Sequence, residues 1–515
     1  MGWTPGIRDL PGLLDLFAGE DEADARAAEK AVLRIEARQH ARVLDEAIAR
    51  TRAATRPARG RLTRLVDRLA SANAESADAA RAFFLEMLGD ADPKTRRAAA
   101  RALGKLPSPE PETERALLAA WDVADSDDDR NALADALGRI GTPAARERIA
   151  SLGARGSRAA VMLDRETSRE RPGAIDASRA FDGPIVVRFH TRAGLERVVV
   201  DELGDIWRPR IAGPGVVEAR LDGPLALALA VRTATHVAFP LDPVPIEGGL
   251  AETIVRAVTS PAAMRVFSTY TQRDDGAPIR FRLAWARGGH RRSLAWRCAE
   301  LVRETTTELV NDPTASTWEV VVDDGDDTVA IDLVPRAEDT RFAYRKRTVS
   351  ASSHPTIAAA LARLAPRRAG DVVWDPFCGA GAELFERARL GPYARLIGTD
   401  TAGDAIAAAR ENTAGLENIV LEIADATRHR PRDVNVIVTN PPMGRRLHRG
   451  AHGEILERFV SHAADVLVPG GFLVWTVPEP RRVHARAARA GLVLERAWTV
   501  DMGGFPAALS VHRKK

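Results

Sequence analysis

The stretch VVWDPFCGAGAELFERARL, residues 372–390, decides the fold of the C-terminal part of this chain. It has the pattern of a short buried strand, a turn at Asp375–Gly381 and the start of a helix. Gly379 and Gly381 carry no Cβ, so the backbone of the turn can approach a ligand closely. In open parallel sheets, ligands bind at the carboxyl ends of strands. The turn therefore predicts a ligand site, and the alternative is a glycine turn that binds nothing.

The same pattern continues on both sides of this turn from His354 onward. Apolar strands alternate with helices, which is typical of a parallel sheet covered on both faces. The expected strands are VVWDPF (372–377), RLIGTD (395–400), IVLEIAD (419–425), VNVIVTN (434–440) and FLVWTV (472–477). Residues 492–514 should form a final antiparallel hairpin. We expect a Rossmann-like α/β domain over residues 336–515.

Acidic residues stand at the ends of the next two strands. Asp400 ends the second strand, where a carboxylate can accept hydrogen bonds from both ribose hydroxyls of a nucleoside. The alternative is that Asp400 is the N-cap of the helix that follows. Asp425 and Ala426 follow the third strand, where they could bind an adenine amino group. The alternative for Asp425 is an ordinary loop aspartate.

The fourth strand runs into Asn440-Pro441-Pro442-Met443. Proline cannot extend a central strand, so the hydrogen-bond ladder ends there. The Asn440 amide and the Pro441 carbonyl should then face the pocket and hold the two N–H bonds of an exocyclic amine. Asn440 cannot act as a general base, so catalysis would rest on positioning and electrostatics. The alternative is a structural turn.

In these residues the chain resembles the class I methyltransferases, through DPFCGAG, GTD, ADA and TNPP in this order. Residues 184–515 further resemble the THUMP-domain, UPF0020-like RNA methyltransferases that make N2-methylguanosine in tRNA or rRNA. The segments that carry this resemblance are AGLERVVVDELGD (193–205), VVVDDGDDTVAIDLVPR (320–336), YRKRTVSASSHPTIAAALARLA (344–365) and TNPPMGRRL (439–447).

The resemblance implies a pocket for S-adenosylmethionine and a role for each matching residue. The residues that line this pocket would be Asp375, Phe377, Cys378, Gly379, Gly381, Asp400, Asp425, Ala426 and Asn440. Pro355 and Thr356 would cover the cofactor. Asn440 and Pro441, with Pro442 and Met443 beside them, would hold the guanine amine. Met443 departs from the family, which usually has an aromatic residue there to stack on the base, and Met should stack more weakly. Ala382 stands where Thr is common.

The chain before this domain has two further parts. Residues 1–165 are rich in Ala, Arg and Leu at helical spacing, and Leu103-Gly104-Lys105-Leu106 aligns with Leu137-Gly138-Arg139-Ile140. We expect an all-α solenoid of HEAT-like repeats that serves as a docking surface, with a non-repeating helical bundle as the alternative. Residues 166–183 have no sustained period and are predicted to be a linker.

Residues 184–335 alternate short strands and helices, which predicts a compact α+β region of ferredoxin-like, THUMP-like type. A helix is expected over 291–310 and a hairpin with its turn at 323–327. The resemblance makes this region the RNA-docking module.

The composition sets limits on partners and location. The 515 residues carry 74 basic and 71 acidic side chains, a net charge of +3, which permits an RNA partner without requiring one. Arg445 and Arg446 are candidates for RNA phosphate contact, as are Arg291 and Arg292; for the last two, and for Arg449, Arg481 and Arg482, a solvated surface is an equal alternative. His290 and His354 lack metal-ligand spacing, and no metal is expected. Two cysteines, no signal peptide and no long apolar run suggest a cytoplasmic protein without a membrane contact.

We therefore expect an S-adenosylmethionine-dependent enzyme that methylates the exocyclic N2 of guanosine in RNA, with tRNA favoured over rRNA. Three alternatives remain at this point. One is a catalytically weak RNA-binding or assembly factor that retains the cofactor pocket, and Met443 favours it. The others are a DNA adenine-N6 and a protein-glutamine methyltransferase, because these enzymes share the asparagine-proline motif. The helical repeats would bind a further protein or RNA.

Overall fold

The computed structural model describes residues 5–19, 21–35, 39–55, 58–72, 77–107, 110–141, 143–171, 173–289, 291–325, 327–350, 352–443, 451–478 and 480–515. The chain divides into two compact units. Unit 1 comprises Met1–Gly173, Pro245–Thr259 and Arg273–Ser316, and unit 2 comprises Ala174–Val244, Ser260–Gln272 and Thr317–Lys515. The α+β region expected over residues 184–335 is thus shared between both units.

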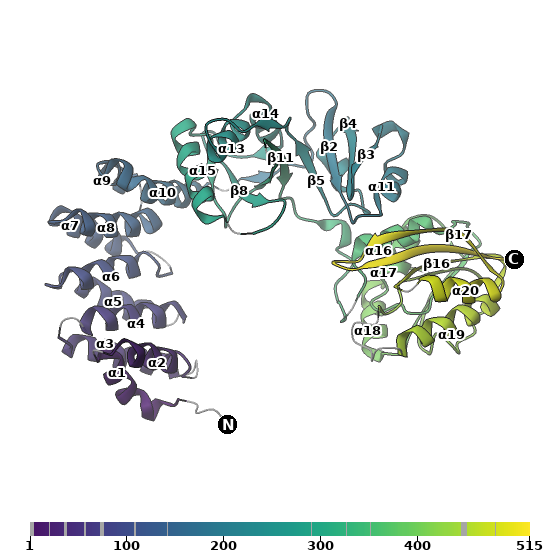
Figure 1. The fold of residues 1–515 in the computed structure, drawn as a ribbon, viewed down its shortest axis with the longest axis horizontal. Helices are drawn as coiled ribbons and strands as arrows, with labels where there is room; N and C mark the ends of the chain where they lie inside the picture. The colour runs from purple at the N-terminus through teal and green to yellow at the C-terminus, as the bar shows by residue number, and fades with distance from the viewer. Residues whose placement is uncertain are drawn as a thin grey trace. The chain divides into compact units, whose positions relative to one another are not determined.

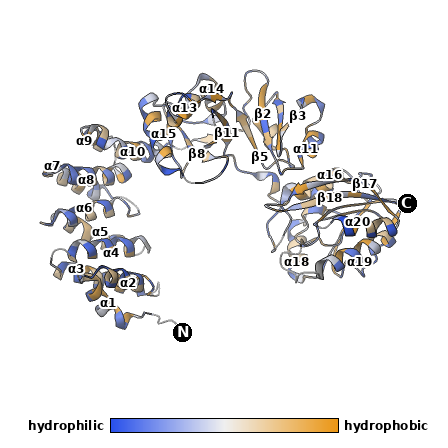
Figure 2. Cartoon of the chain, in the orientation of Figure 1, coloured by the Kyte–Doolittle hydropathy of each residue, from blue (hydrophilic) through white to orange (hydrophobic). Residues whose placement is uncertain are grey.

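The N-terminal part of unit 1 is a stack of short helices, drawn in purple to blue in Figure 1. They are α1 (Leu10–Ala18), α2 (Glu22–Val32), α3 (His40–Ala53), α4 (Ala58–Ala72), α5 (Ala77–Met87), α6 (Pro93–Leu103), α7 (Pro111–Asp122), α8 (Asp127–Ile140), α9 (Arg146–Ala150) and α10 (Ser157–Arg169). Helices α4, α6, α8 and α10 pack on one another in sequence order, which confirms the predicted helical repeats. Their apolar residues form one continuous core, and each helix carries both hydrophobic and hydrophilic residues (Figure 2). Among the described helices, none is long and apolar enough to cross a membrane.

Close helix packing explains the repeated Leu-Gly pair of the sequence. A Cβ on Gly104 would lie 2.7 Å from the Cα of Ala136 in α8. A Cβ on Gly138 would lie 2.4 Å from the carbonyl oxygen of Ala159 in α10. Both glycines therefore occupy places where each repeat contacts the backbone of the next, which no larger residue allows.

Helix α10 continues to Arg169, so the linker predicted over 166–183 is wrong for residues 166–169. The cause is a set of contacts that the local sequence does not reveal. Arg169 donates to both carboxylate oxygens of Asp312, each at 2.7 Å. Arg165 donates to the Oδ1 of Asn311 at 2.7 Å. These bonds favour continued helix through a polar stretch that has no apolar period.

The remainder of unit 1 contains α13 (Leu250–Val258), β8 (Ile279–Trp285), α15 (Arg292–Thr305) and β9 (Leu309–Asn311). Strands β8 and β9 pair in parallel. The helix predicted over 291–310 is wrong beyond Thr305, because the chain becomes extended at Thr306 and then enters β9. Three consecutive threonines, whose branched Cβ disfavours helix, stand at this point.

Unit 2 begins with a twisted sheet, in the order β3-β4-β2-β5-β11-β10. The strands of this sheet in unit 2 are β2 (Ile185–His190), β3 (Arg210–Gly213), β4 (Val216–Leu221), β5 (His236–Pro240), β10 (Trp318–Asp324) and β11 (Thr328–Pro335). The same part of unit 2 contains the helices α11 (Glu196–Leu203), α12 (Leu225–Leu229) and α14 (Pro261–Tyr270). It also contains the short strands β1 (Ala174–Ile175) and β7 (Thr271–Gln272), which pair with each other in a separate sheet. The predicted hairpin is confirmed, with Trp318 opposite Pro335. The sequence did not predict β3 or α14.

The C-terminal sheet of unit 2 has the strand order β14-β13-β12-β15-β16-β18-β17. Its strands are β12 (Val372–Asp375), β13 (Arg395–Asp400), β14 (Ile419–Ile423), β15 (Val434–Thr439), β16 (Leu467–Val477), β17 (Leu492–Asp501) and β18 (Pro506–Lys514). The first five are parallel, and β17 and β18 form the antiparallel hairpin that the sequence predicts. Because β12 and β13 are adjacent, the turns that follow them lie at the same edge.

Helices cover both faces of this sheet. One apolar core joins it to α16 (Pro355–Leu364), α17 (Ala382–Arg389) and α18 (Gly403–Asn412). The other joins it to α19 (Ala451–Val466) and α20 (Pro480–Arg489). The predicted α/β domain is thereby confirmed. Because helices cover both faces of the sheet, a ligand site is expected at the carboxyl ends of its central strands.

Candidate active site

The turn after β12 has the open backbone that its glycines predict. Gly379 has a φ of +49° and Gly381 a φ of +81°, conformations that disfavour other residues. A Cβ on Gly379 would meet no atom within 4 Å, whereas one on Gly381 would lie 3.2 Å from the Cγ2 of Thr413. The space beside the backbone of Gly379 is thus open to a ligand. Gly381 is required for the close packing of α17 on α18.

Asp375 is completely buried at the start of this turn. Its Oδ1 accepts hydrogen bonds from the Oγ1 of Thr439 at 2.6 Å and from the amide of Phe377 at 3.2 Å. Its Oδ2 is buried and has no hydrogen-bond partner among the described residues. Burial raises the pKa of Asp375 well above its usual value, and the carboxylate of Glu383 raises it further. The part of the site that the structure describes therefore contains a buried acceptor without a hydrogen-bond partner.

Glu383 is a second buried acid, in the first turn of α17, and only 3% of it is exposed. Burial raises the pKa of Glu383 to about 7. Its Oε1 accepts a hydrogen bond from the hydroxyl of Ser353. The charge of Glu383 raises the pKa of Asp375, so the site disfavours the state in which both acids are ionised.

Asp400 ends β13 and binds the turn after β12. Its Oδ2 accepts from the amide of Gly379, and its Oδ1 from the amide of Ala402, both at 3.0 Å. The N-cap of α18 is Ala402, so the alternative that Asp400 caps this helix is wrong. Its contact with ribose stays a prediction.

Asp425 and Ala426 follow β14. The Oδ1 of Asp425 accepts from the amide and the hydroxyl of Thr427, both at 2.8 Å, and the backbone bond to Thr427 lowers its pKa. Ala426 is buried beneath the loop. The side chain of Asp425 thus stabilises its own loop, and its contact with adenine stays a prediction.

Asn440 follows β15 and is held from two sides. Its Nδ2 donates to the Oγ of Ser353 at 2.9 Å, and its Oδ1 accepts from the Oγ1 of Thr476 in β16. Pro441 is buried, Pro442 exposed and Met443 half-buried. The amide of Asn440 is thereby fixed, at the same end of the sheet as the glycine turn.

The segment before α16 lies against this group of residues. Pro355 is the first residue of α16, and Thr356 is buried with its Oγ1 2.7 Å from the Nδ1 of His354. Burial lowers the pKa of His354 to about 4. Of this segment, Ser353 is the residue that bonds both Glu383 and Asn440.

Residues 343–505 match the UPF0020 family model, described as an RMKL-like methyltransferase domain, and residues 63–161 match HEAT repeats. The tRNA (guanine(6)-N2)-methyltransferase of Thermus thermophilus is 35% identical over 184 residues, 34% of this chain and 53% of that protein. The chain thus spans about half the length of this relative. A "Probable tRNA (guanine(10)-N2)-dimethyltransferase" of Methanothermococcus thermolithotrophicus is 33% identical over 131 residues, 23% of this chain and 77% of that protein.

This chain belongs to the UPF0020 methyltransferase family. A further relative, the U6 snRNA (guanine-N(2))-methyltransferase THUMPD2 of Bos taurus, is 30% identical over 154 residues, 29% of this chain and 30% of that protein. Two solved structures share the fold. TrmN from Thermus thermophilus has a TM-score of 0.50 at 24% identity and covers 64% of this chain and 99% of its own. SMU.472, complexed with SAH, has a TM-score of 0.51 at 14% identity and covers 65% and 99%.

The structure describes only some of the arginines that were predicted to contact RNA. Arg445, Arg446 and Arg449 lie outside the described residues, as does His290. Arg292 begins α15 and Arg291 stacks on Trp285 at 4.9 Å, both in unit 1. Arg481 and Arg482 lie in α20, where Arg482 pairs with Glu457 at 2.8 Å. No described contact distinguishes these residues from an ordinary charged surface.

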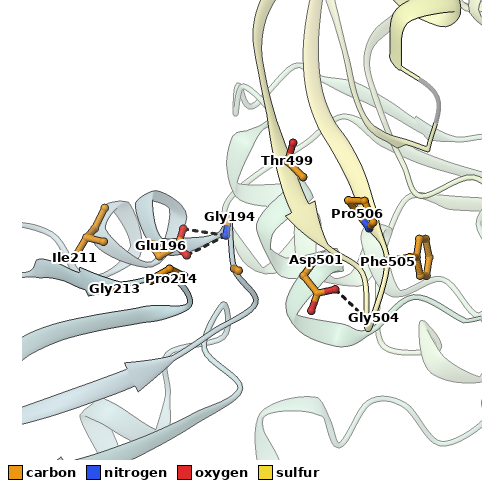
Figure 3. A pocket seen from close by; sticks show the side chains of 11 residues that line it. Gly194, Glu196, Ile211, Gly213, Pro214, Thr499, Asp501, Gly504, Phe505 and Pro506 are labelled. Carbon is orange, nitrogen blue, oxygen red and sulfur yellow. Dashed lines mark hydrogen bonds between the residues drawn. The ribbon is translucent and has the colours of Figure 1, made fainter. Parts of the chain in front are cut away.

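A cavity of about 670 Å³ occurs elsewhere in unit 2 (Figure 3). It lies between the loops of the first sheet and the turn of the β17–β18 hairpin, with Ile211 and Phe505 in its lining. The two acids that line the cavity accept hydrogen bonds from backbone amides. Glu196 accepts from the amide of Gly194, and Asp501 accepts from the amide of Gly504 (Figure 3). These carboxylates stabilise turns, so we assign no chemistry to this cavity.

Sequence reasoning missed Ser353, Glu383 and Thr476. Glu383 stands in the first turn of a helix, where an acid is favourable in any protein and gives no sign of burial. Thr476 is hidden in an apolar strand. No local pattern in the sequence therefore marks Glu383 as part of the site.

Proposed function

We propose that this chain uses S-adenosylmethionine to methylate the exocyclic N2 of guanosine in RNA, with tRNA as the favoured substrate. The observation that carries the proposal is the fixed amide of Asn440 at the end of β15, beside the glycine turn of a UPF0020 methyltransferase domain. The named relatives act on the N2 of guanine in tRNA or U6 snRNA.

The residues of the turn fit this cofactor. The unpartnered Oδ2 of Asp375 and the nearby Glu383 supply negative charge for a ligand that carries an ammonium and a sulfonium group. The bare backbone at Gly379 leaves room for close approach. The carboxylate of Asp400 would accept hydrogen bonds from the ribose hydroxyls. When bound, the cofactor supplies an electrophilic methyl group.

Asn440 and Pro441 would hold the guanine amine. The Oδ1 of Asn440 uses one of its two lone pairs for Thr476 and keeps one for an N–H of the substrate. The carbonyl of Pro441 would accept the second N–H. When both hydrogens are held out of the ring plane, the lone pair of the amine nitrogen is no longer delocalised into the ring. The nitrogen then becomes nucleophilic. Since Asn440 takes no proton, the proton released after transfer leaves to water.

The substrate base must leave its stack to reach Asn440, because a paired guanine has its amine engaged. We assign RNA docking to the α+β region over residues 184–335, the role that the family resemblance implies for it. The helical repeats would add a surface for a further protein or RNA. Met443 would contact the extruded base.

The test is transfer of labelled methyl from S-adenosylmethionine to tRNA, rRNA, duplex DNA and protein in parallel, with Asn440→Ala as the control. We expect label in tRNA that falls by about 10²–10³-fold in the variant, the range for loss of one group that acts on the reacting centre. Label found only in DNA or protein would show that the substrate is another planar amine or amide, such as adenine N6 or glutamine. Binding of SAH with no transfer to any substrate would instead indicate an RNA-binding factor that retains the pocket.

A further inference from the structure

We infer that Ser353 and Glu383 are positioning residues that fix which way the side-chain amide of Asn440 faces, so that its oxygen, and not its NH2 group, meets the substrate amine. The inference rests on the proposed transfer to an amine held by Asn440. It concerns a chain of hydrogen bonds that runs from α17 through the segment before α16 to the ends of β15 and β16.

The direction of each bond in this chain follows from its first member. An ionised carboxylate only accepts hydrogen bonds, so the hydroxyl proton of Ser353 must point to Glu383. The Oγ of Ser353 then has only lone pairs to offer to Asn440. It therefore accepts from the Nδ2 of Asn440, as the 2.9 Å contact shows.

The opposite side of Asn440 has the complementary arrangement. Thr476 is completely buried, and its hydroxyl donates to the Oδ1 of Asn440. An amide rotated by half a turn would place NH2 against Thr476 and oxygen against Ser353, and the second contact would bring two acceptors together. It would also turn an N–H toward the N–H bonds of the substrate. The hydrogen bonds of Ser353 and Thr476 thus disfavour the rotated amide, which is the orientation that cannot accept from an amine.

The orientation of the Asn440 amide therefore depends on the charge of Glu383. The titratable groups that face it come from four parts of the chain: Asp375 from β12, Cys378 from the glycine turn, Glu386 from α17, and Tyr344 and Arg345 from the segment before α16. With its pKa at about 7, Glu383 gains a proton as the pH falls below neutral. The protonated acid can donate to Ser353, whose own proton is then free to point to Asn440 and permit the rotated amide.

The first experiment compares Ser353→Ala, Ser353→Thr and Ser352→Ala in the full chain, by kcat for methyl transfer to tRNA and by the Kd for SAH. Ser352 is the matched control, because its hydroxyl bonds only Val349. We expect kcat to fall about tenfold in Ser353→Ala, the scale of one lost hydrogen bond in a site, and the Kd to change less than about twofold. Ser353→Thr, which keeps the hydroxyl, should restore kcat. Equal loss in Ser352→Ala, or a loss confined to the Kd, would overturn the inference.

The second experiment uses Glu383→Gln and does not depend on activity. The nitrogen-15 resonance of the Asn440 side-chain amide, assigned by its loss in Asn440→Asp, is followed from pH 5.5 to pH 8.5. We expect a titration near pH 7 in the wild type that is absent in Glu383→Gln, and a changed resonance in Ser353→Ala. An Asn440 resonance insensitive to both substitutions would sink the inference even in an active enzyme. If the wild type transfers no methyl but the resonance titrates, the proposed function fails and the positioning chain stands.

Discussion

The hydroxyl of Thr476 in β16 donates to the Oδ1 of Asn440 at the end of the neighbouring strand β15. Thr439, the residue before Asn440, is paired with Trp475, the residue before Thr476. The parallel register of two central strands therefore determines which hydroxyl reaches the amide. A functional group at the end of a strand is thus positioned by a buried side chain of the strand beside it.

Thr476→Val removes this hydroxyl and keeps the shape of the side chain. We expect kcat for methyl transfer to fall about three- to tenfold, because one hydrogen bond that orients Asn440 is lost. The Kd for SAH, measured by calorimetry, should remain unchanged. Ser510→Ala is the control, since this buried hydroxyl of β18 contacts His484 and not Asn440. A full-rate Thr476→Val enzyme would show that Asn440 needs no such support.

Glu383→Gln should stabilise the protein more at pH 8 than at pH 5. The folded-state pKa of about 7 is above the ordinary value of 4.5, so the folded state retains a proton that the unfolded state has lost between these values. Stability from this group is therefore present at low pH and is lost as the pH rises through 7. The difference between the two pH values should approach roughly 2–3 kcal/mol for the ligand-free protein. Thermal unfolding at both pH values measures it, and a gain equal at pH 5 and pH 8 would contradict the assignment.

Arg232→Met should strongly destabilise unit 2. Arg232 donates through two nitrogens to the two oxygens of Glu386 in α17, each at 2.7 Å, and Glu386 is only 2% exposed. Removing one partner of a buried pair leaves an uncompensated charge, at a cost of about 3–5 kcal/mol. The double variant Arg232→Met with Glu386→Leu should recover a large part of the lost melting temperature. If the double variant melts no higher than the single one, the charge of Glu386 is not the cause.

Arg169→Met should destabilise unit 1, because Asp312 is completely buried against Arg169. The hydrogen bond from Arg169 helps to hold the pKa of Asp312 below its ordinary value, so its contribution is present at neutral pH and lost as the pH falls through the folded-state pKa. We expect the loss of melting temperature to be the same at pH 7 and pH 5 and to shrink only as the pH falls below the ordinary Asp value of 3.8. Arg148→Met, which breaks the exposed pair with Asp122, is the control and should cost at most about 1 kcal/mol.

The parts of the fold that follow from local pattern could be predicted from the sequence. The apolar strands, the turn around Gly379 and the acids at strand ends need only neighbouring residues to be recognised. The extension of α10 to Arg169 could not be predicted, because it depends on Asp312, far along the chain. The end of α15 at Thr305 was missed for a related reason: β9 becomes a strand only by pairing with β8.

The site divides in the same way. Asp375, Asp400 and Asn440 stand in recognisable motifs, and the topology brings the ends of their strands to one edge of the sheet. Ser353 and Glu383 were not predicted, because their role arises from a contact between the segment before α16 and the first turn of α17. Burial of an acid at a helix start leaves no local pattern, so only the packed structure shows it.

The most direct test of the account is the identity of the nucleoside that receives the methyl group. Unmodified tRNA is incubated with S-adenosylmethionine and either the wild-type chain or Asn440→Ala, digested to nucleosides and analysed by mass spectrometry. We expect N2-methylguanosine with the wild type and none with the variant. N6-methyladenosine, another methylated nucleoside, or N2-methylguanosine that persists in Asn440→Ala would contradict it.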